Sequence, residues 1–241
     1  LTMERGSGQV LLRSCLDGDV SNSGVVHLKV DRVRAEGDGS AEVCTTTMES
    51  GIGIAMACAQ RAGVVKCRGR TDRELGDADP CVTALGAIPS SGERAAGHDF
   101  EALLEEGESM EIHKFVTVHT SRDVAWRRRG QRPAMDELLS TARANANEAA
   151  SSGVSECRQE HSEGWRRKWE RCDILLDGPD RDRMAVRFAL FHLASLGPKS
   201  DDTVSIAAKG LHGEGYKGHV FWDTEIFILP FYVAQFPDVA R

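Results

Sequence analysis

A glycine-rich run that leads into an aromatic residue and a carboxylate is the part of the chain best suited to chemistry. It spans residues 210–225, and within it Trp222 is followed directly by Asp223. Glycine lets the backbone bend where bulkier residues cannot. An indole face packs on the apolar C–H face of a sugar ring, and a carboxylate accepts hydrogen bonds from hydroxyl groups. The pattern therefore predicts a sugar-binding site in which Trp222 and Asp223 are the binding residues.

Other side chains of the same run could border this site. Glu214 and Tyr216 lie in the loop, where each could either shape the backbone or touch a sugar. His219 could also reach the pocket edge, although a histidine between glycine and valine is more often a satisfied loop or core group. Glu225 follows Asp223 by two positions, which places the two side chains on opposite sides of a helix. The two carboxylates are therefore not predicted to form a catalytic pair.

Composition and motif spacing argue against several other kinds of site. The glycine spacing matches neither a P-loop nor a dinucleotide fingerprint, and no nucleophile elbow is present. The seven cysteines lack C-x-x-C spacing and the eight histidines are scattered, so we expect no metal, no cofactor, and reduced thiols in a cytoplasmic protein. The net charge of −7 comes from interleaved acids and bases, which predicts no nucleic-acid partner. No apolar run reaches about 18 residues, so no membrane span is expected.

Short β-rich runs precede residue 122 and would form part of an antiparallel β-sandwich. Residues 25–33 alternate with period two, residues 42–48 are rich in β-branched side chains, and residues 51–60 could form a strand or a short helix. In the run 109–121 the alternation slips near Lys114, which predicts a β-bulge there. The polar segment 68–94 is predicted to be a loop.

After residue 122 the apolar side chains recur at helical spacing. Two amphipathic helices are predicted at 135–149 and 154–172, separated near Gly153. Residues 184–196 are apolar nearly all round, which predicts burial on several sides, and a fourth helix is expected from about Trp222 through Gln235. The basic cluster 166–168 is predicted to be a solvated face, with attraction of phosphate as the alternative. Trp165, Trp169 and His161 form a predicted packing stripe.

These segments together resemble glycoside hydrolase family 65, which includes maltose, trehalose, kojibiose and nigerose phosphorylases and some acid trehalases. The longest match is residues 210–231. Shorter matches occur in the same order along the chain, at residues 16–24, 114–123, 161–174 and 187–193.

The resemblance implies an α+β multidomain fold. Residues 1–122 would be part of the N-terminal antiparallel β-sandwich, 123–175 a helical linker, and 176–241 the first helices of an incomplete (α/α)6 catalytic barrel. The chain opens with Leu1 rather than methionine and looks helical where it stops, so we expect a fragment of a longer protein. The family's general-acid glutamate would then lie beyond Arg241, and this chain alone would catalyse nothing.

The resemblance also implies the reaction. Inorganic phosphate, as co-substrate, would attack the anomeric carbon of an α-linked glucose disaccharide with inversion and give β-glucose 1-phosphate. Trp222 and Asp223 would hold the non-reducing glucose unit. Two alternatives stay open, an inverting trehalase-like hydrolase of the same family and a non-catalytic sugar-binding or scaffold chain. Members of the family are often dimers, which leaves a homodimer open.

Overall fold

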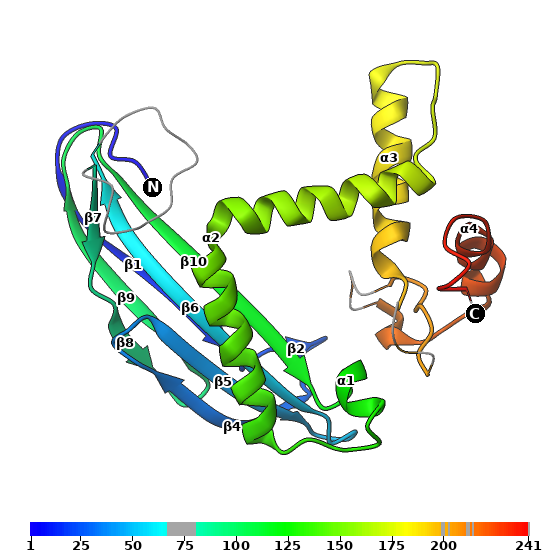
Figure 1. The fold of residues 1–241 in the computed structure, drawn as a ribbon, viewed down its shortest axis with the longest axis horizontal. Helices are drawn as coiled ribbons and strands as arrows, with labels where there is room; N and C mark the ends of the chain where they lie inside the picture. Colours follow the sequence, from blue (N-terminus) through cyan, green and yellow to red (C-terminus); the bar gives the residue numbers. More distant parts are fainter. Residues whose placement is uncertain (67–80, 199–200, 202, 211–212, 214, 241) are drawn as a thin grey trace. The chain divides into compact units, whose positions relative to one another are not determined.

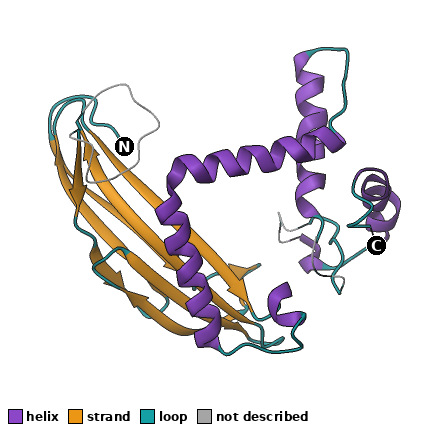
Figure 2. Cartoon of the chain, viewed as in Figure 1, coloured by secondary structure: helices purple, strands orange, loops and turns teal. Residues whose placement is uncertain are grey.

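The computed structural model describes residues 1–66, 81–198, 201, 203–210, 213 and 215–240. The chain divides into two compact units, Leu1–Arg158 and Gln159–Arg241. The first unit is mainly β-sheet and the second is helical (Figures 1 and 2). Each unit is described by itself.

The first unit is built on two antiparallel sheets that pack face to face (Figure 1). The smaller sheet has the strand order β1-β9-β8, and the larger has the order β10-β6-β5-β4 with β7 also paired to β6. A short separate hairpin joins β2 to β3. The strand bounds are Gly8–Asp17 (β1), Ser21–Asn22 (β2), Val25–Val26 (β3), Leu28–Ala35 (β4), Ser40–Thr47 (β5), Gly53–Val65 (β6), Val82–Leu85 (β7), Ile88–Ser91 (β8), Ala95–Leu104 (β9) and Ser109–Thr120 (β10).

Alternate side chains of the facing strands fill the space between the sheets. Ala62 and Val64 of β6 pack with Phe100 and Leu104 of β9 in one buried cluster. A second buried cluster contains Leu16, Ala41, Val43, Cys58 and Ala96. The predicted sandwich-like arrangement of sheets is therefore confirmed.

A polar pair separates these two apolar clusters. Gln60 and His98 are both buried, and the Gln60 Nε2 atom lies 3.0 Å from His98 Nδ1. His98 Nε2 lies 2.6 Å from the Glu36 carbonyl oxygen. A carbonyl can only accept, so Nε2 carries the proton and Nδ1 accepts from the Gln60 amide. This pair ties the β4–β5 turn to the interior of the sandwich.

Helix α2 (Met135–Cys172) covers the other face of the larger sheet with its N-terminal half (Figure 1). Small side chains on the sheet let the helix approach closely, and the buried residues of this contact are Cys44, Ala55, Ala57, Leu138, Leu139, Ala142 and Ala146. The Arg143 guanidinium donates to the buried Glu42 carboxylate at 2.6 Å. The first unit thus has three layers, a small sheet, a large sheet and a helix.

The structure corrects two predictions about the strands. Within the segment predicted to be a loop, β7 and β8 are strands, while residues 67–80 lie outside the described part of the chain. The bulge expected near Lys114 is wrong, because β10 pairs with β6 in continuous register from Ser109 to Thr120. An irregularity occurs instead between Val30 and Arg32 of β4. Residues 51–60, which could have been helix or strand, belong mostly to β6.

The second unit contains the C-terminal half of α2, then α3 (Asp180–Leu196) and α4 (Leu229–Gln235). A 3-10 turn, η1 (Gly215–Gly218), and a π-helical turn, η2 (Thr224–Ile228), lie between α3 and α4. The buried residues of its core are Cys172, Ala194, Ile206, Tyr232 and Phe236, with Trp165 and Trp169 packed against them. The Tyr232 hydroxyl donates to the Leu193 carbonyl and so ties α4 to α3.

The predicted helices are present with shifted bounds. Gly153, with φ 87° and ψ 170°, interrupts α2 between the two predicted helical segments. A short helix, α1 (Val124–Arg127), was not predicted. Of α3, only Leu190 and Ala194 are buried, so the expected burial on several sides is not found within the described chain. The chain does not stay helical at its end, because α4 ends at Gln235. That α3 and α4 begin a barrel stays a prediction.

Cysteine chemistry differs from the prediction at one position. Cys81 is disulfide-bonded, so the expectation of reduced thiols throughout is wrong there. The other described cysteines are free thiols, namely Cys15, Cys44, Cys58, Cys157 and Cys172. Among the described residues, no group of three or more His, Cys, Asp or Glu side chains could hold a metal ion. The described helices also include none with the length and apolar character needed to cross a bilayer.

Candidate functional site

Trp222 and Asp223 lie at the N-terminal start of the helical run that continues through η2 into α4. The buried residue next to them, Thr224, fixes this start. Its hydroxyl donates to the Ile206 carbonyl oxygen at 2.6 Å, which joins the segment before the glycine-rich loop to the helix after it. Sequence patterning did not indicate Thr224, because its partner is 18 residues away.

The Trp222 indole is held at the surface. Its side chain is 66% exposed, and its nearest aromatic neighbour is Phe227, with ring centroids 6.4 Å apart. An exposed indole backed by one ring offers a flat apolar face to a ligand. Phe227 was not among the predicted site residues, although it is itself 67% exposed.

Asp223 carries an unused carboxylate. It is half-buried, and its side chain makes no cap hydrogen bond to the helix that it begins. It forms no ion pair or hydrogen bond with any side chain in the described ranges. The positive end of the helix dipole stabilises a negative charge at this position, while all four acceptor positions of the carboxylate stay open to a ligand.

The loop before the pair is strained. Tyr216, Lys217 and Gly218 are successive residues in the left-handed region, with φ of 60°, 49° and 74°. This conformation suits glycine but is costly for the other two, and such strain clusters at binding and catalytic sites. The His219 amide donates to the Tyr216 carbonyl at 2.9 Å and closes the turn.

Aromatic and cationic contacts hold the loop. The Tyr216 ring meets Phe221 edge to face at a centroid distance of 5.2 Å. Lys209 Nζ lies 5.4 Å from the centre of the same ring, on its other side of the sequence. Tyr216 and His219 are both exposed, so both could border a ligand, and neither Lys209 nor Phe221 had been predicted.

The remaining predicted residues do not extend the constellation. Glu214 lies outside the described residues. Glu225 is exposed and forms no ion pair with a described residue, and its place two positions after Asp223 in a helical turn directs it to the opposite side. The described part of the site therefore supplies an aromatic face and one free carboxylate, which can bind and orient a polyhydroxyl ligand.

Comparison with known protein families agrees with this chemistry. Residues 1–168 match the N-terminal domain of glycosyl hydrolase family 65, and residues 187–241 match that family's central catalytic domain. The chain belongs to glycosyl hydrolase family 65. Trp222 and Asp223 fall within the part matched by the catalytic domain of this family.

Several curated members of family 65 are similar over nearly the whole chain. A kojibiose phosphorylase from Halothermothrix orenii is 37% identical over 98% of this chain, and one from Escherichia coli is 34% identical over 96%. A nigerose phosphorylase from Lachnoclostridium phytofermentans is 32% identical over 56% of the chain. The chain spans only 28%, 27% and 16% of the length of these three relatives.

A solved structure shows the same fold. "Putative kojibiose phosphorylase from human microbiome" superimposes with a TM-score of 0.63 over 97% of this chain and 28% of its own, at 19% sequence identity. The mixed arrangement of sheets and helices is therefore shared with that protein.

Proposed function

We propose that the complete protein is an inverting phosphorylase of α-linked glucose disaccharides that releases β-glucose 1-phosphate. The observation that carries the proposal is the unpartnered Asp223 carboxylate beside the exposed Trp222 indole, in a segment matched by the family's central catalytic domain. Relatives named kojibiose, nigerose and α,α-trehalose phosphorylase support the substrate class.

The proposed mechanism needs one carboxylic acid and a bound phosphate. The acid protonates the glycosidic oxygen while phosphate attacks the anomeric carbon from the opposite face, so the configuration inverts. Phosphate takes the place of the base-activated water of an inverting hydrolase. The family resemblance places the acid beyond Arg241, and no residue of the described chain is assigned to that role.

In this scheme Trp222 and Asp223 hold the non-reducing glucose unit in the subsite before the scissile bond. The indole packs on the C–H face of the ring, and the carboxylate accepts from two ring hydroxyls. Fixing the ring fixes the anomeric carbon relative to the phosphate, which lowers the entropic part of the barrier. Glu214, Tyr216 and His219 would form the edge of this subsite.

Other features of the proposal concern the complete protein. Inorganic phosphate is the co-substrate and no further cofactor is needed, because proton transfer and phosphate attack complete the reaction. We place the enzyme in the cytoplasm and allow for a homodimer. Nucleic acid and membranes are not proposed as partners.

The decisive experiment assays the complete gene product on kojibiose, nigerose, trehalose and maltose, with and without inorganic phosphate. We expect turnover of at least one disaccharide only when phosphate is present, with the β-anomer of glucose 1-phosphate identified by proton NMR before mutarotation of the free sugar. Phosphate-independent release of glucose would show a hydrolase instead. Disaccharide binding by calorimetry without turnover would show a sugar-binding chain.

A further inference from the structure

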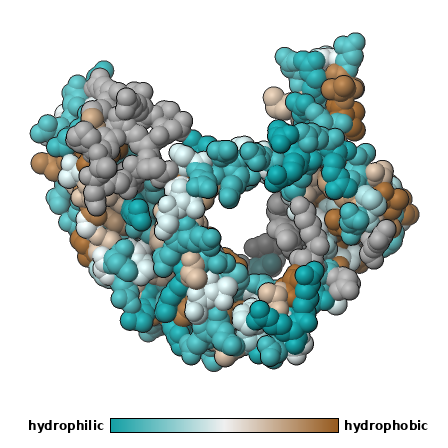
Figure 3. Space-filling model, in the orientation of Figure 1, coloured by the Kyte–Doolittle hydropathy of each residue, from teal (hydrophilic) through white to brown (hydrophobic). Residues whose placement is uncertain are grey.

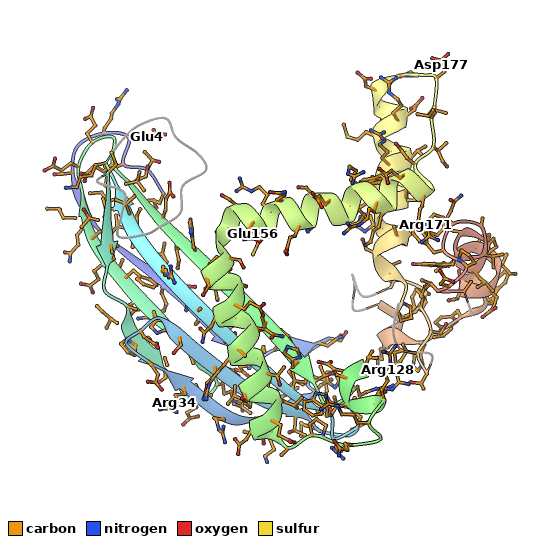
Figure 4. All side chains as sticks on the ribbon, in the orientation of Figure 1. Glu4, Arg34, Arg128, Glu156, Arg171 and Asp177 are labelled. Carbon is orange, nitrogen blue, oxygen red and sulfur yellow. The ribbon has the colours of Figure 1, made fainter. Side chains whose placement is uncertain are left out.

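A pocket of about 580 Å³ lies in the second unit, lined by the C-terminal part of α2 and by residues that follow α4. The helix contributes Gly164, Trp165 and Arg171, and the opposite wall contains Phe236 and Asp238. Figure 4 labels Arg171 on the α2 side of this region. Its volume falls in the range of roughly 300–1,000 Å³ typical of small-molecule sites. Neither Trp222 nor Asp223 is among its lining residues.

The lining of this pocket is cationic. Arg167, Lys168 and Arg171 come from α2, whereas Asp238 is the single acidic residue among the described lining residues. Three cations and one carboxylate leave a net charge of 3 − 1 = +2, before any protonation of His161. Positions 164, 167, 168 and 171 are three and four residues apart, so they share one helix face. The basic residues thus converge on the pocket.

Aromatic rings hold two of these cations without neutralising them. Lys168 Nζ lies 4.2 Å from the centre of the Trp165 ring, and Arg171 Cζ lies 4.8 Å from that of Phe236. A cation over a ring face is attracted by the quadrupole of the ring and keeps its full charge for a ligand. Trp165 is also stacked on Phe191, at a centroid distance of 4.7 Å, so its faces are occupied and it serves to position Lys168.

The neighbouring arginine of the same basic cluster behaves differently. Arg166 donates to Glu170 one helical turn later, on the exposed side of α2, and is not part of the pocket lining. Arg167 and Arg171 form no ion pair with any residue in the described ranges. The charge of Arg166 is therefore already used, whereas those of Arg167 and Arg171 are available.

The pocket is hollow next to these cations. A Cβ atom added at Gly164 would meet no atom within 4 Å, although Gly164 lines the pocket from the middle of a helix. Inorganic phosphate alone would leave most of a 580 Å³ space unfilled. The ligand should therefore carry an anionic group at Arg167 and Arg171 and a polar body that extends over Gly164 toward Asp238.

We propose that this pocket binds a phosphorylated hexose. The phosphate dianion would be held by the guanidinium groups of Arg167 and Arg171 and by the Lys168 ammonium, in charge-assisted hydrogen bonds. The hexose would fill the space above Gly164, where its hydroxyls donate to the Asp238 carboxylate. The site is separate from the sugar subsite at Trp222, and it does not depend on the proposed reaction.

Calorimetric titration of the complete gene product with glucose 6-phosphate tests the site. We expect saturable binding that Arg171→Gln and Arg167→Gln each weaken by about tenfold or more, because each removes a charge-assisted contact. Gly164→Glu should abolish binding, since it places a carboxylate among the three cations. Gly164→Ala adds one methyl group in open space at a helical position, and Arg166→Gln changes a charge outside the pocket, so both should bind like the parent protein.

Each contrary outcome is specific. No binding of glucose 6-phosphate to the parent protein would overturn the site, as would binding that Gly164→Glu and Arg171→Gln leave unchanged. Equal affinity for inorganic phosphate would show an anion site without hexose recognition and would also overturn the proposal. Binding lost in Trp222→Ala but kept in Gly164→Glu would assign the ligand to the sugar subsite instead. Disaccharide turnover without this binding would separate its failure from that of the proposed function.

Discussion

Asp223 is stabilised in its charged form by the helix that it begins, and this is what leaves it free to bind. A carboxylate at a helix N-terminus interacts favourably with the helix dipole and does not need an arginine or lysine partner that would compete with a ligand. Its neighbour Thr224 carries the structural load, because the buried Thr224 hydroxyl bonds the Ile206 carbonyl. Anchoring and ligand contact are thus divided between two adjacent residues.

The first prediction concerns the two binding residues. In the complete gene product, Trp222→Ala and Asp223→Asn should each lower kcat/KM for the disaccharide substrate by about 100-fold or more, of the order seen when a preorganised polar contact is removed. The melting temperature should stay within about 2 °C of the parent, because Trp222 is mostly exposed and Asp223 has no protein partner. Steady-state kinetics and thermal unfolding measure the two effects.

Glu225→Gln is the matched control for Asp223→Asn. It removes a carboxylate only two residues away, on the opposite side of the helical turn, and should leave kcat/KM within about threefold of the parent, well under 1.4 kcal/mol. A loss at Glu225 as large as that at Asp223 would contradict the assignment. Near-parental turnover in both Trp222→Ala and Asp223→Asn would also remove it.

The second prediction concerns Cys44, which is fully buried between α2 and the larger sheet. Burial raises the pKa of its thiol from 9.0 to about 11. As the pH rises above 9, the thiol ionises in the unfolded chain before it does so in the folded one, so the unfolded state is favoured. The contribution of Cys44 to the free energy of unfolding should therefore fall by about 1.4 kcal/mol per pH unit between these values.

Urea denaturation between pH 8 and pH 10.5 measures this effect. The background from other titrating groups is removed by comparison with Cys44→Ala, which should be less stable at pH 8 because of the lost side chain but should show a shallower decline above pH 9. Parallel declines in the two proteins would mean that Cys44 titrates normally in the folded state.

The sequence predicted site residues that are adjacent in the chain and missed those that act through tertiary contacts. Trp222 and Asp223 are visible because their side-chain types are informative next to a glycine-rich run. Lys209 packs on Tyr216 and Thr224 bonds Ile206, and these roles depend on how the loop folds back. Glu214 belongs to the same run but lies outside the described residues.

At the scale of elements, β9 shows why a central strand can be overlooked. Its inward side chains Ala96, Phe100, Ala102 and Leu104 alternate with period two, yet small residues and the buried His98 weaken the pattern. A buried histidine is accommodated only because Gln60 and the Glu36 carbonyl satisfy both ring nitrogens, and neither partner is near it in the chain.

The false bulge in β10 has a related cause. Met110 and Ile112 point into the sandwich core, and Lys114 continues the same face, which reads as a break in the apolar pattern. Its Nζ atom donates to the Cys15 carbonyl of β1 at 2.7 Å. A long side chain thus crosses to the opposite sheet and satisfies a backbone group there, so the strand stays regular where hydrophobicity alone predicts a slip.

The third prediction tests how closely β1 and β9 approach. Gly97 of β9 is opposite Cys15 of β1, and a Cβ at Gly97 would collide with the Ser14 carbonyl and lie 2.7 Å from Cys15 Cβ. Gly97→Ala should therefore lower the free energy of unfolding by about 1–3 kcal/mol. Gly92→Ala, in the β8–β9 turn, adds the same methyl group where no atom lies within 4 Å and should change it by less than about 0.5 kcal/mol. Urea denaturation compares the two, and equal stability would contradict the close approach.

At the scale of the whole molecule, the two units differ in how completely they bury their apolar side chains. Three buried clusters lie within residues 1–158, two between the sheets and one under α2. The second unit has one buried cluster and leaves large apolar side chains exposed, including Leu175 at 95%, Met184 at 70% and Phe227 at 67%. Figure 3 shows exposed hydrophobic side chains over the segment after α2 and over α4.

The fourth prediction follows from this difference. A fragment of residues 1–158 should fold by itself and unfold cooperatively in urea, because its three layers enclose their own core. Trp126, one of four tryptophans in the chain and the only one in this fragment, packs against the cluster under α2, so its fluorescence reports docking of that helix. A fragment of residues 159–241 should bind a hydrophobic dye and lack a cooperative transition, since exposed apolar patches of this kind favour association. A cooperative transition in the second fragment, or a broad non-cooperative one in the first, would show that the cores are not divided at Arg158.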